Sequence, residues 1–115
     1  QVIKGWVDSD GMEREQVYTV AGDSHNNATV DPDTCEPFGE GYESLSVVWT
    51  DPDFDPMLPA FYYVRVVENP SCRWVQYDCN KFEEGEQPES CTNPAVKKVI
   101  QERAVTSPIW YEPAT

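Results

Sequence analysis

The chain has 115 residues, the length of one domain, and we expect residues 1–115 to fold around a single core. Its 21 acidic and 8 basic side chains give a net charge of −13, which repels the phosphates of nucleic acids and anionic lipid surfaces. No apolar run approaches the roughly 18 residues that a membrane-spanning helix needs. Composition therefore excludes nucleic acid as a partner and argues against a membrane span.

The first predicted element is a β-hairpin. Residues 2–7 and 16–21 have strand character, and residues 8–11, Asp-Ser-Asp-Gly, have the composition of a tight turn because Gly adopts positive φ without steric cost. Gln1 leads directly into the first strand without an initiator Met, a basic leader or an apolar signal region. We therefore expect the chain to be a segment of a longer protein.

Residues 22–41 are rich in Asp, Asn, Ser, Thr, Pro and Gly, which predicts a long surface loop. This loop contains His25, the only histidine of the chain. A general base needs a nucleophile and an orienting partner, and no such pattern surrounds His25. The sequence therefore indicates polar surface at this position rather than a catalytic site.

Two apolar runs form the predicted centre of the fold. Residues 45–50 and 61–68 consist largely of aromatic and β-branched side chains, as buried strands do. Their 10-residue connection is too short for a parallel crossover, which favours antiparallel pairing. The connection also contains three closely spaced carboxylates: Asp51, Asp53 and Asp55.

These three carboxylates allow two interpretations. Crowded Asp oxygens would lose their mutual repulsion by binding a hard cation, of which calcium is the candidate. In the other interpretation the loop is a proline-stiffened turn whose Asp side chains accept hydrogen bonds from backbone amides. Calcium takes six or more oxygens, and the loop matches no known calcium pattern, so the sequence favours the turn. No other cofactor is indicated.

The remaining elements follow turn and capping signals. Residues 73–78 are predicted as a short strand. A helix is predicted to begin at Thr92 or Asn93, with a proline at its first position. Its apolar residues recur at helical spacing: Val96, Val99 and Ile100. Residues 104–111 are predicted as a last extended segment, in which Pro108 indicates an edge or a bulge. The predicted fold is mainly β: a small antiparallel sheet or sandwich with long loops and one short C-terminal helix.

Four cysteines occur at long and uneven spacings: Cys35, Cys72, Cys79 and Cys91. They include no C-x-x-C pair of the kind that zinc sites use, whereas disulfides tolerate such spacings. Three pairings satisfy the count, and nearness in sequence slightly favours Cys72 with Cys79 and Cys35 with Cys91. Disulfides indicate an oxidising compartment, which is the periplasm or the cell exterior.

Three stretches resemble a known family. They are IKGWVDSDG near the start, VVWTDPDFDPMLPAFYYVRVVENPSCRW in the middle and QERAVTSPIWYEP near the end. On these motifs the chain resembles the C-terminal segment of a bacterial family of uncharacterised secreted proteins, the domain-of-unknown-function family 3604. The N-terminal portion of that family is similar to PHP-type metal-dependent phosphoesterases, whose His-x-His and further ligands bind a metal cluster. Those ligands have no counterpart here, so the resemblance transfers no catalytic residue.

The resemblance implies a non-catalytic accessory domain that packs against the hydrolase portion of the same polypeptide. In this hypothesis one sheet face meets that partner, and Trp110 and Tyr111 close the sheet or the interface. A bare apolar face would also allow the chain to form oligomers. No nucleophile and base form a recognisable arrangement, so the residues do not predict a free-standing enzyme.

The alternative is an independent module that binds calcium or carbohydrate. Such a module would use exposed aromatic side chains beside acidic loops: Trp6, Trp74 and Tyr62. Because tryptophan more often belongs to a core than to a ligand platform, the accessory domain is the favoured hypothesis.

Overall fold

The computed structural model describes residues 1–114, which form two compact units. Unit 1 contains residues 1–24 and 42–67 and the described residues from 103 onward. Unit 2 contains residues 25–41 and 68–102. All strand pairs are antiparallel and the helices are short, so the predicted mainly β class is confirmed.

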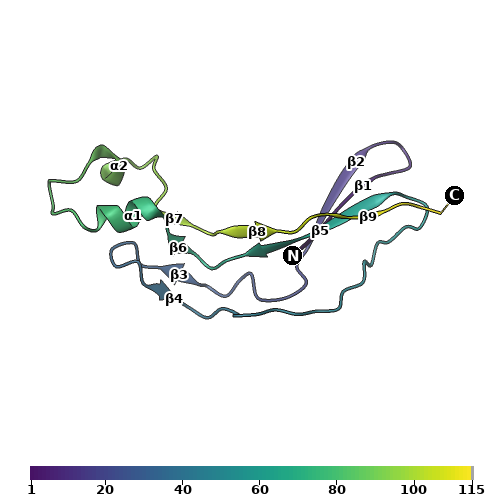
Figure 1. Ribbon diagram of the computed structural model, residues 1–115, viewed down its shortest axis with the longest axis horizontal. Helices are drawn as coiled ribbons and strands as arrows, with labels where there is room; N and C mark the ends of the chain where they lie inside the picture. Colours follow the sequence, from purple (N-terminus) through teal and green to yellow (C-terminus); the bar gives the residue numbers. More distant parts are fainter. Residues whose placement is uncertain (115) are drawn as a thin grey trace. The chain divides into compact units, whose positions relative to one another are not determined.

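Unit 1 is built on one antiparallel sheet (Figure 1). Its strands are β1 (Val2–Val7), β2 (Glu13–Tyr18), β5 (Ala60–Val67), β8 (Arg103–Val105) and β9 (Ile109–Tyr111). The order is β2-β1-β5-β8, and β9 also pairs with β5. β5 is the longest strand and the one that the others share, which agrees with its aromatic and β-branched composition.

The predicted hairpin is confirmed, with a return strand that begins and ends three residues earlier than expected. The side chain of Asp8 holds the turn, because its Oδ1 accepts hydrogen bonds from the amides of Asp10 and Met12. Its Oδ2 accepts a third bond, from Arg14 Nε at 2.7 Å. Gly11 has a φ of 78°, the left-handed conformation for which glycine was expected there.

The interrupted C-terminal segment is also confirmed. β8 and β9 both pair with β5, and residues 106–108 between them leave the ladder. The Thr106 hydroxyl accepts a hydrogen bond from the Val64 amide, which replaces a backbone bond at the break. Pro108 lies in this break, where its missing amide hydrogen costs no strand pairing.

The strand predicted over residues 45–50 is wrong. Residues 42–59 form no strand, and most of the large apolar side chains in the predicted strand are exposed, with Val48 at 99%. Both sides of β1 are already paired, by β2 and β5, and the other side of β5 is paired by β8 and β9. The segment therefore has no place beside these central strands, and its Trp49 packs instead against rings of the sheet, as described below.

One close contact fixes the centre of the sheet. Gly5 and Phe61 are direct cross-strand partners, and a Cβ atom added to Gly5 would lie 2.3 Å from the Phe61 ring. The ring occupies the space that a side chain on β1 would fill. Phe61 also contacts Trp110 of β9, with ring centroids 5.2 Å apart, so this glycine allows aromatic packing across three strands.

Unit 2 has little regular structure. It contains two two-stranded sheets, β3 (Thr29–Val30) with β4 (Pro37–Phe38) and β6 (Ser71–Cys72) with β7 (Val99–Ile100). Its helices are α1 (Trp74–Cys79) and α2 (Glu89–Thr92). Strands of two residues are marginal by themselves, so other interactions must stabilise this unit.

Two sequence predictions in unit 2 are wrong. Residues 74–79 form α1 rather than a strand, because helical spacing brings Gln76 and Asn80 together: both side chains donate to the carbonyl of Pro32. The helix predicted from Thr92 or Asn93 is absent. There the Asn93 side chain accepts from the Ala95 amide in a tight turn, and Val99 and Ile100 pair as β7 with β6.

The four cysteines form two disulfides, but with a different pairing from the one that sequence distance favoured. Cys35 bonds to Cys72 and Cys79 to Cys91, with Cα–Cα distances of 5.6 and 5.5 Å. Cys72 ends a strand and Cys79 ends the helix that follows, so the fold turns them toward different neighbours. Both disulfides lie inside unit 2, and none lies in unit 1.

We expect reduction to unfold unit 2 and to spare unit 1. The loops closed by the two disulfides span sequence separations of 37 and 12, for which loop-closure entropy gives stabilisation of about 4 and about 3 kcal/mol. Hydrogen exchange with and without dithiothreitol measures this. Amides of α1, β3 and β6 should lose protection, while those paired between β1 and β5 keep it. Equal loss in β1 and β5 would show that the two units unfold together.

Candidate functional site

A buried ion pair lies on one face of the unit 1 sheet. The Lys4 Nζ is 2.6 Å from Asp51 Oδ2, and the two side chains are only 5% and 6% exposed. The same ammonium donates to the backbone carbonyl of Asp53 at 2.7 Å. Lys4 comes from β1, and both acceptors come from the acidic loop. The ammonium of Lys4 is therefore the cation that pairs with the Asp51 carboxylate of the acidic loop.

Two tyrosines of the sheet complete this cluster. Tyr62 donates to Asp51 Oδ2 at 2.7 Å, and Tyr18 donates to Asp53 Oδ2 at 2.9 Å. The Asp53 amide donates to Asp51 Oδ1 at 2.9 Å. We call these five residues the Lys4 network: Lys4, Tyr18, Asp51, Asp53 and Tyr62.

Trp49 packs beside the Lys4 network. Its ring lies 5.0 Å from that of Tyr18 and 6.3 Å from that of Tyr62, measured between centroids. Aromatic packing of this kind limits the access of water to the hydrogen bonds next to it.

Burial and hydrogen bonding shift the pKa values in the Lys4 network. Burial alone would raise the pKa of the Asp51 carboxyl, but hydrogen bonds from Lys4 and Tyr62 outweigh it and hold that pKa below its usual range. Burial and the neighbouring carboxylates raise the pKa of Tyr18 and of Tyr62 well above the ordinary value for tyrosine. A catalytic acid or base works best with a pKa near the working pH, and these shifts move all three groups away from neutrality.

Each of the three carboxylates singled out in the sequence has a partner within the chain. Asp51 pairs with Lys4, Asp53 accepts from Tyr18, and Asp55 accepts from the Met57 amide at 2.8 Å. Within residues 1–114, no group of three or more His, Cys, Asp or Glu has the arrangement to bind a metal ion. The calcium site therefore stays a prediction, whereas bonds from backbone amides to Asp51 and Asp55 are the ones expected of a stiff turn.

Sequence reasoning did not find Lys4, although a signal was present. Strand alternation places Lys4 on the same face as Val2 and Trp6, so a single lysine interrupts an apolar face. A lysine at an inward position requires a carboxylate partner or an aromatic ring. The structure supplies both, because Lys4 Nζ also lies 4.9 Å from the centre of the Trp6 ring.

The opposite face of the sheet carries an aromatic and apolar surface. Phe61 stacks with Tyr63 at 6.5 Å between ring centroids and contacts Trp110. Trp110 is 69% exposed, and Val105 on the same face is 64% exposed. We call this surface the aromatic strip and define it by five residues of β5, β8 and β9: Phe61, Tyr63, Val67, Val105 and Trp110.

Two other candidates from the sequence belong to unit 2. His25 is an exposed residue of unit 2. Trp74 lies on α1 in the same unit and is 73% exposed. Among the described residues, none of the helices is long and apolar enough to cross a membrane.

Loss of Lys4 should strongly destabilise unit 1. Lys4→Met leaves the Asp51 carboxylate buried without its cation, and we expect the free energy of unfolding to fall by about 3 kcal/mol. Urea unfolding followed by circular dichroism measures the loss. Arg14→Met is the matched control, because Arg14 pairs with Asp8 at the exposed turn and should cost less than about 1 kcal/mol. The double variant Lys4→Met/Asp51→Leu should cost less than the sum of its single changes, and simple additivity would contradict a coupled pair.

The raised tyrosine pKa values predict a loss of stability in alkali. Tyrosine in the unfolded chain ionises near pH ~10, while Tyr18 and Tyr62 stay neutral in the fold. The unfolded state therefore releases protons first, and the free energy of unfolding should fall as the pH rises above about 10. Urea midpoints from about pH 8 to pH 11 measure the slope. Tyr62→Phe should flatten it, and an unchanged slope would contradict the assignment; Tyr77→Phe controls for loss of a phenol.

Comparison with known families identifies one family that matches the chain. Residues 1–113 match a family that is described as a protein of unknown function, DUF3604. Comparison with curated proteins and with solved structures finds no significant match. The match extends over nearly the whole chain, including the hairpin, the acidic loop and the three motifs on which the resemblance was noticed. The chain therefore belongs to the DUF3604 family of proteins of unknown function.

Proposed function

We propose that the chain is a non-catalytic accessory domain that docks through its aromatic strip onto another domain of the same polypeptide. In this proposal the partner is the PHP-like, metal-dependent hydrolase portion that the family resemblance implies. The observation that carries the proposal is the extent of exposed apolar surface on the sheet of unit 1, where Trp110 and Val105 are more than half exposed.

The accessible surface of the chain is too large for a protein of this mass. It amounts to 8932 Å², whereas a compact monomer of 13.1 kDa exposes about 6,400 Å². Even two separately folded halves would expose only about 7,700 Å². This excess of at least about 1,200 Å² belongs to the whole chain, since exposed apolar side chains occur in both units, and the aromatic strip provides part of it.

Coverage of the opposite face supports docking through the aromatic strip. On that opposite face the Lys4 network and Trp49 already cover part of the strands. The aromatic strip combines tryptophan, tyrosine and phenylalanine, the residues that interface cores favour. The disulfides support an exported protein, since such bonds persist in the periplasm or outside the cell.

The test compares this chain with a longer version that includes the hydrolase-like portion. We expect Trp110→Ser to lower the thermal stability of the longer protein and to leave that of residues 1–115 nearly unchanged. Ile109→Ser is the matched control, because Ile109 is 73% exposed but lies on the opposite face of the same strand. Equal effects of the two changes in the longer protein would contradict docking through the aromatic strip.

The alternative function, an independent binding module, predicts a different set of results. An independent calcium-binding module would bind Ca²⁺ as residues 1–115 alone, and calorimetry would detect it. That binding should disappear in Asp53→Ala. Calcium binding by the isolated chain that depends on Asp53, together with no effect of Trp110→Ser in the longer protein, would replace the accessory-domain proposal.

A further inference from the structure

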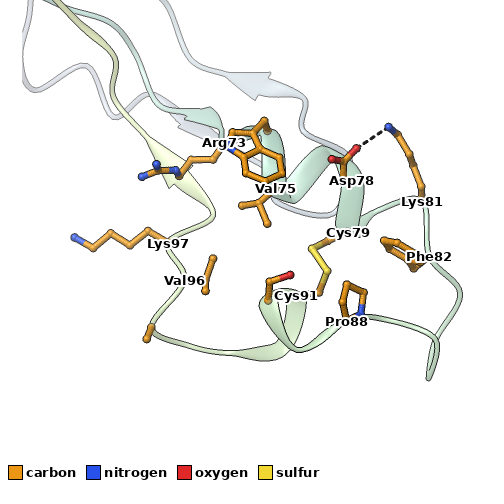
Figure 2. A pocket seen from close by; sticks show the side chains of 13 residues that line it. Arg73, Val75, Asp78, Cys79, Lys81, Phe82, Pro88, Cys91, Val96 and Lys97 are labelled. Carbon is orange, nitrogen blue, oxygen red and sulfur yellow. Dashed lines mark hydrogen bonds and ion pairs between the residues drawn. A yellow bond between two sulfur atoms is a disulfide. The ribbon is translucent and has the colours of Figure 1, made fainter.

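A pocket of about 750 Å³ lies within unit 2, between α1, α2 and the loops that follow them (Figure 2). Its volume falls in the range of roughly 300–1,000 Å³ that is usual for small-molecule sites. Its walls are mainly apolar, and the Cys79–Cys91 disulfide forms part of them. The other apolar groups come from helix α1 and from both loops: Val75, Phe82, Pro88 and Val96.

Covalent and hydrogen bonds hold the walls of the pocket in place. The disulfide joins the end of α1 to α2. Lys98 donates its ammonium to the carbonyl of Cys91, and the Arg73 amide donates to the carbonyl of Lys98 at 2.8 Å. These bonds connect α2, β7 and the start of α1, so the pocket is preformed, which lowers the entropic cost of binding.

Positive charge gathers at this pocket although the chain is strongly acidic. Three of the 8 basic residues line it, namely Arg73, Lys81 and Lys97. Lys81 is neutralised by Asp78 at 2.8 Å, and Figure 2 shows this pair on the other side of the pocket from the Arg73 and Lys97 side chains. Among the described residues, neither Arg73 nor Lys97 forms an ion pair with a carboxylate.

The glutamates of the neighbouring loop do not line the pocket. Glutamates occur at four positions between the helices: Glu83, Glu84, Glu86 and Glu89. None of them lines the pocket. Among the residues that the structure describes, Asp78 is the one acidic residue that does, and Lys81 pairs with it. Two unpaired cations therefore remain at one end, and Trp74, which is 73% exposed, provides an aromatic surface in the lining.

We propose that this pocket binds a small amphipathic anion of about 8 to 12 carbon atoms, with an apolar body and one carboxylate head group. The apolar body lies against the disulfide, Val75 and Phe82, which removes apolar surface from water. Figure 2 shows the Arg73 and Lys97 side chains extending outward at the rim of the pocket, so the head group lies at that rim, where their charges attract it. This function is independent of docking through the aromatic strip, because the pocket lies in unit 2 and the strip in unit 1.

Three probes of eight carbon atoms with different head groups test the proposal: octanoate, 1-octanol and octylammonium. Titrations followed by ¹H–¹⁵N correlation spectra give both the affinity and the residues that respond. We expect octanoate to bind at least about tenfold more tightly than either other probe and to shift the amides of Val75, Cys79 and Val96. Equal affinities, an absence of octanoate binding, or shifts confined to the sheet of unit 1 would overturn the proposal.

Variants separate the contribution of the head group from that of the pocket. Arg73→Gln/Lys97→Gln should weaken octanoate about tenfold, since each exposed ion pair contributes up to about threefold to fivefold, and should leave octanol binding unchanged. The control Asp78→Asn/Lys81→Gln removes the paired charges beside the same pocket and should change octanoate affinity less than twofold. Val96→Trp should narrow the pocket beside the disulfide and weaken binding of both probes. Unchanged octanoate affinity in the first variant would refute a role for its two cations.

Discussion

The buried Lys4–Asp51 pair is the constraint on which unit 1 depends. A lysine ammonium and a carboxylate that are both less than one tenth exposed would each be costly alone, so the sheet and the acidic loop require each other. Tyr62 and the amide of Asp53 satisfy the remaining oxygens of Asp51, and Trp49 packs against the tyrosines. A segment without any strand is thereby held across the face of the sheet, where hydrogen-bonded ladders could not hold it.

Unit 2 is stabilised by a different kind of interaction. Its sheets have only two residues per strand, and its four buried cysteines form two disulfides. Polar bonds from Gln76 and Asn80 to the carbonyl of Pro32 connect α1 to the N-terminal loop of the same unit. The disulfides lower the conformational entropy of the unfolded chain. They thereby stabilise a unit whose apolar burial is too small to stabilise it alone. One small protein thus combines a sheet that needs no disulfide with a unit that has almost no sheet.

The two units, stabilised in these different ways, expose different kinds of surface. In unit 1 the charged and phenolic groups of the Lys4 network bond to one another, while Val105 and Trp110 of the aromatic strip on the other face are more than half exposed. In unit 2 the disulfide that stabilises the helices also forms a wall of the pocket, and the basic residues next to it remain exposed. The docking and the anion binding that we propose would therefore use different units of the chain.

Local chemistry in the sequence determined the mainly β class, the hairpin with Gly11 at its turn, strand β5 and the break at Pro108. Each of these follows from backbone sterics or from the alternation of a few neighbouring residues. Only the tertiary structure decided that residues 45–50 remain outside the sheet, since both edges of β1 and β5 were already paired. It also decided that residues 74–79 are helical and that Cys35 bonds to Cys72, because the partners lie about 40 residues away in the chain. The burial of Lys4 was also decided by the tertiary structure. Strand alternation placed the Lys4 side chain on an inward face, but its ammonium can be buried there only because folding brings the Asp51 carboxylate next to it.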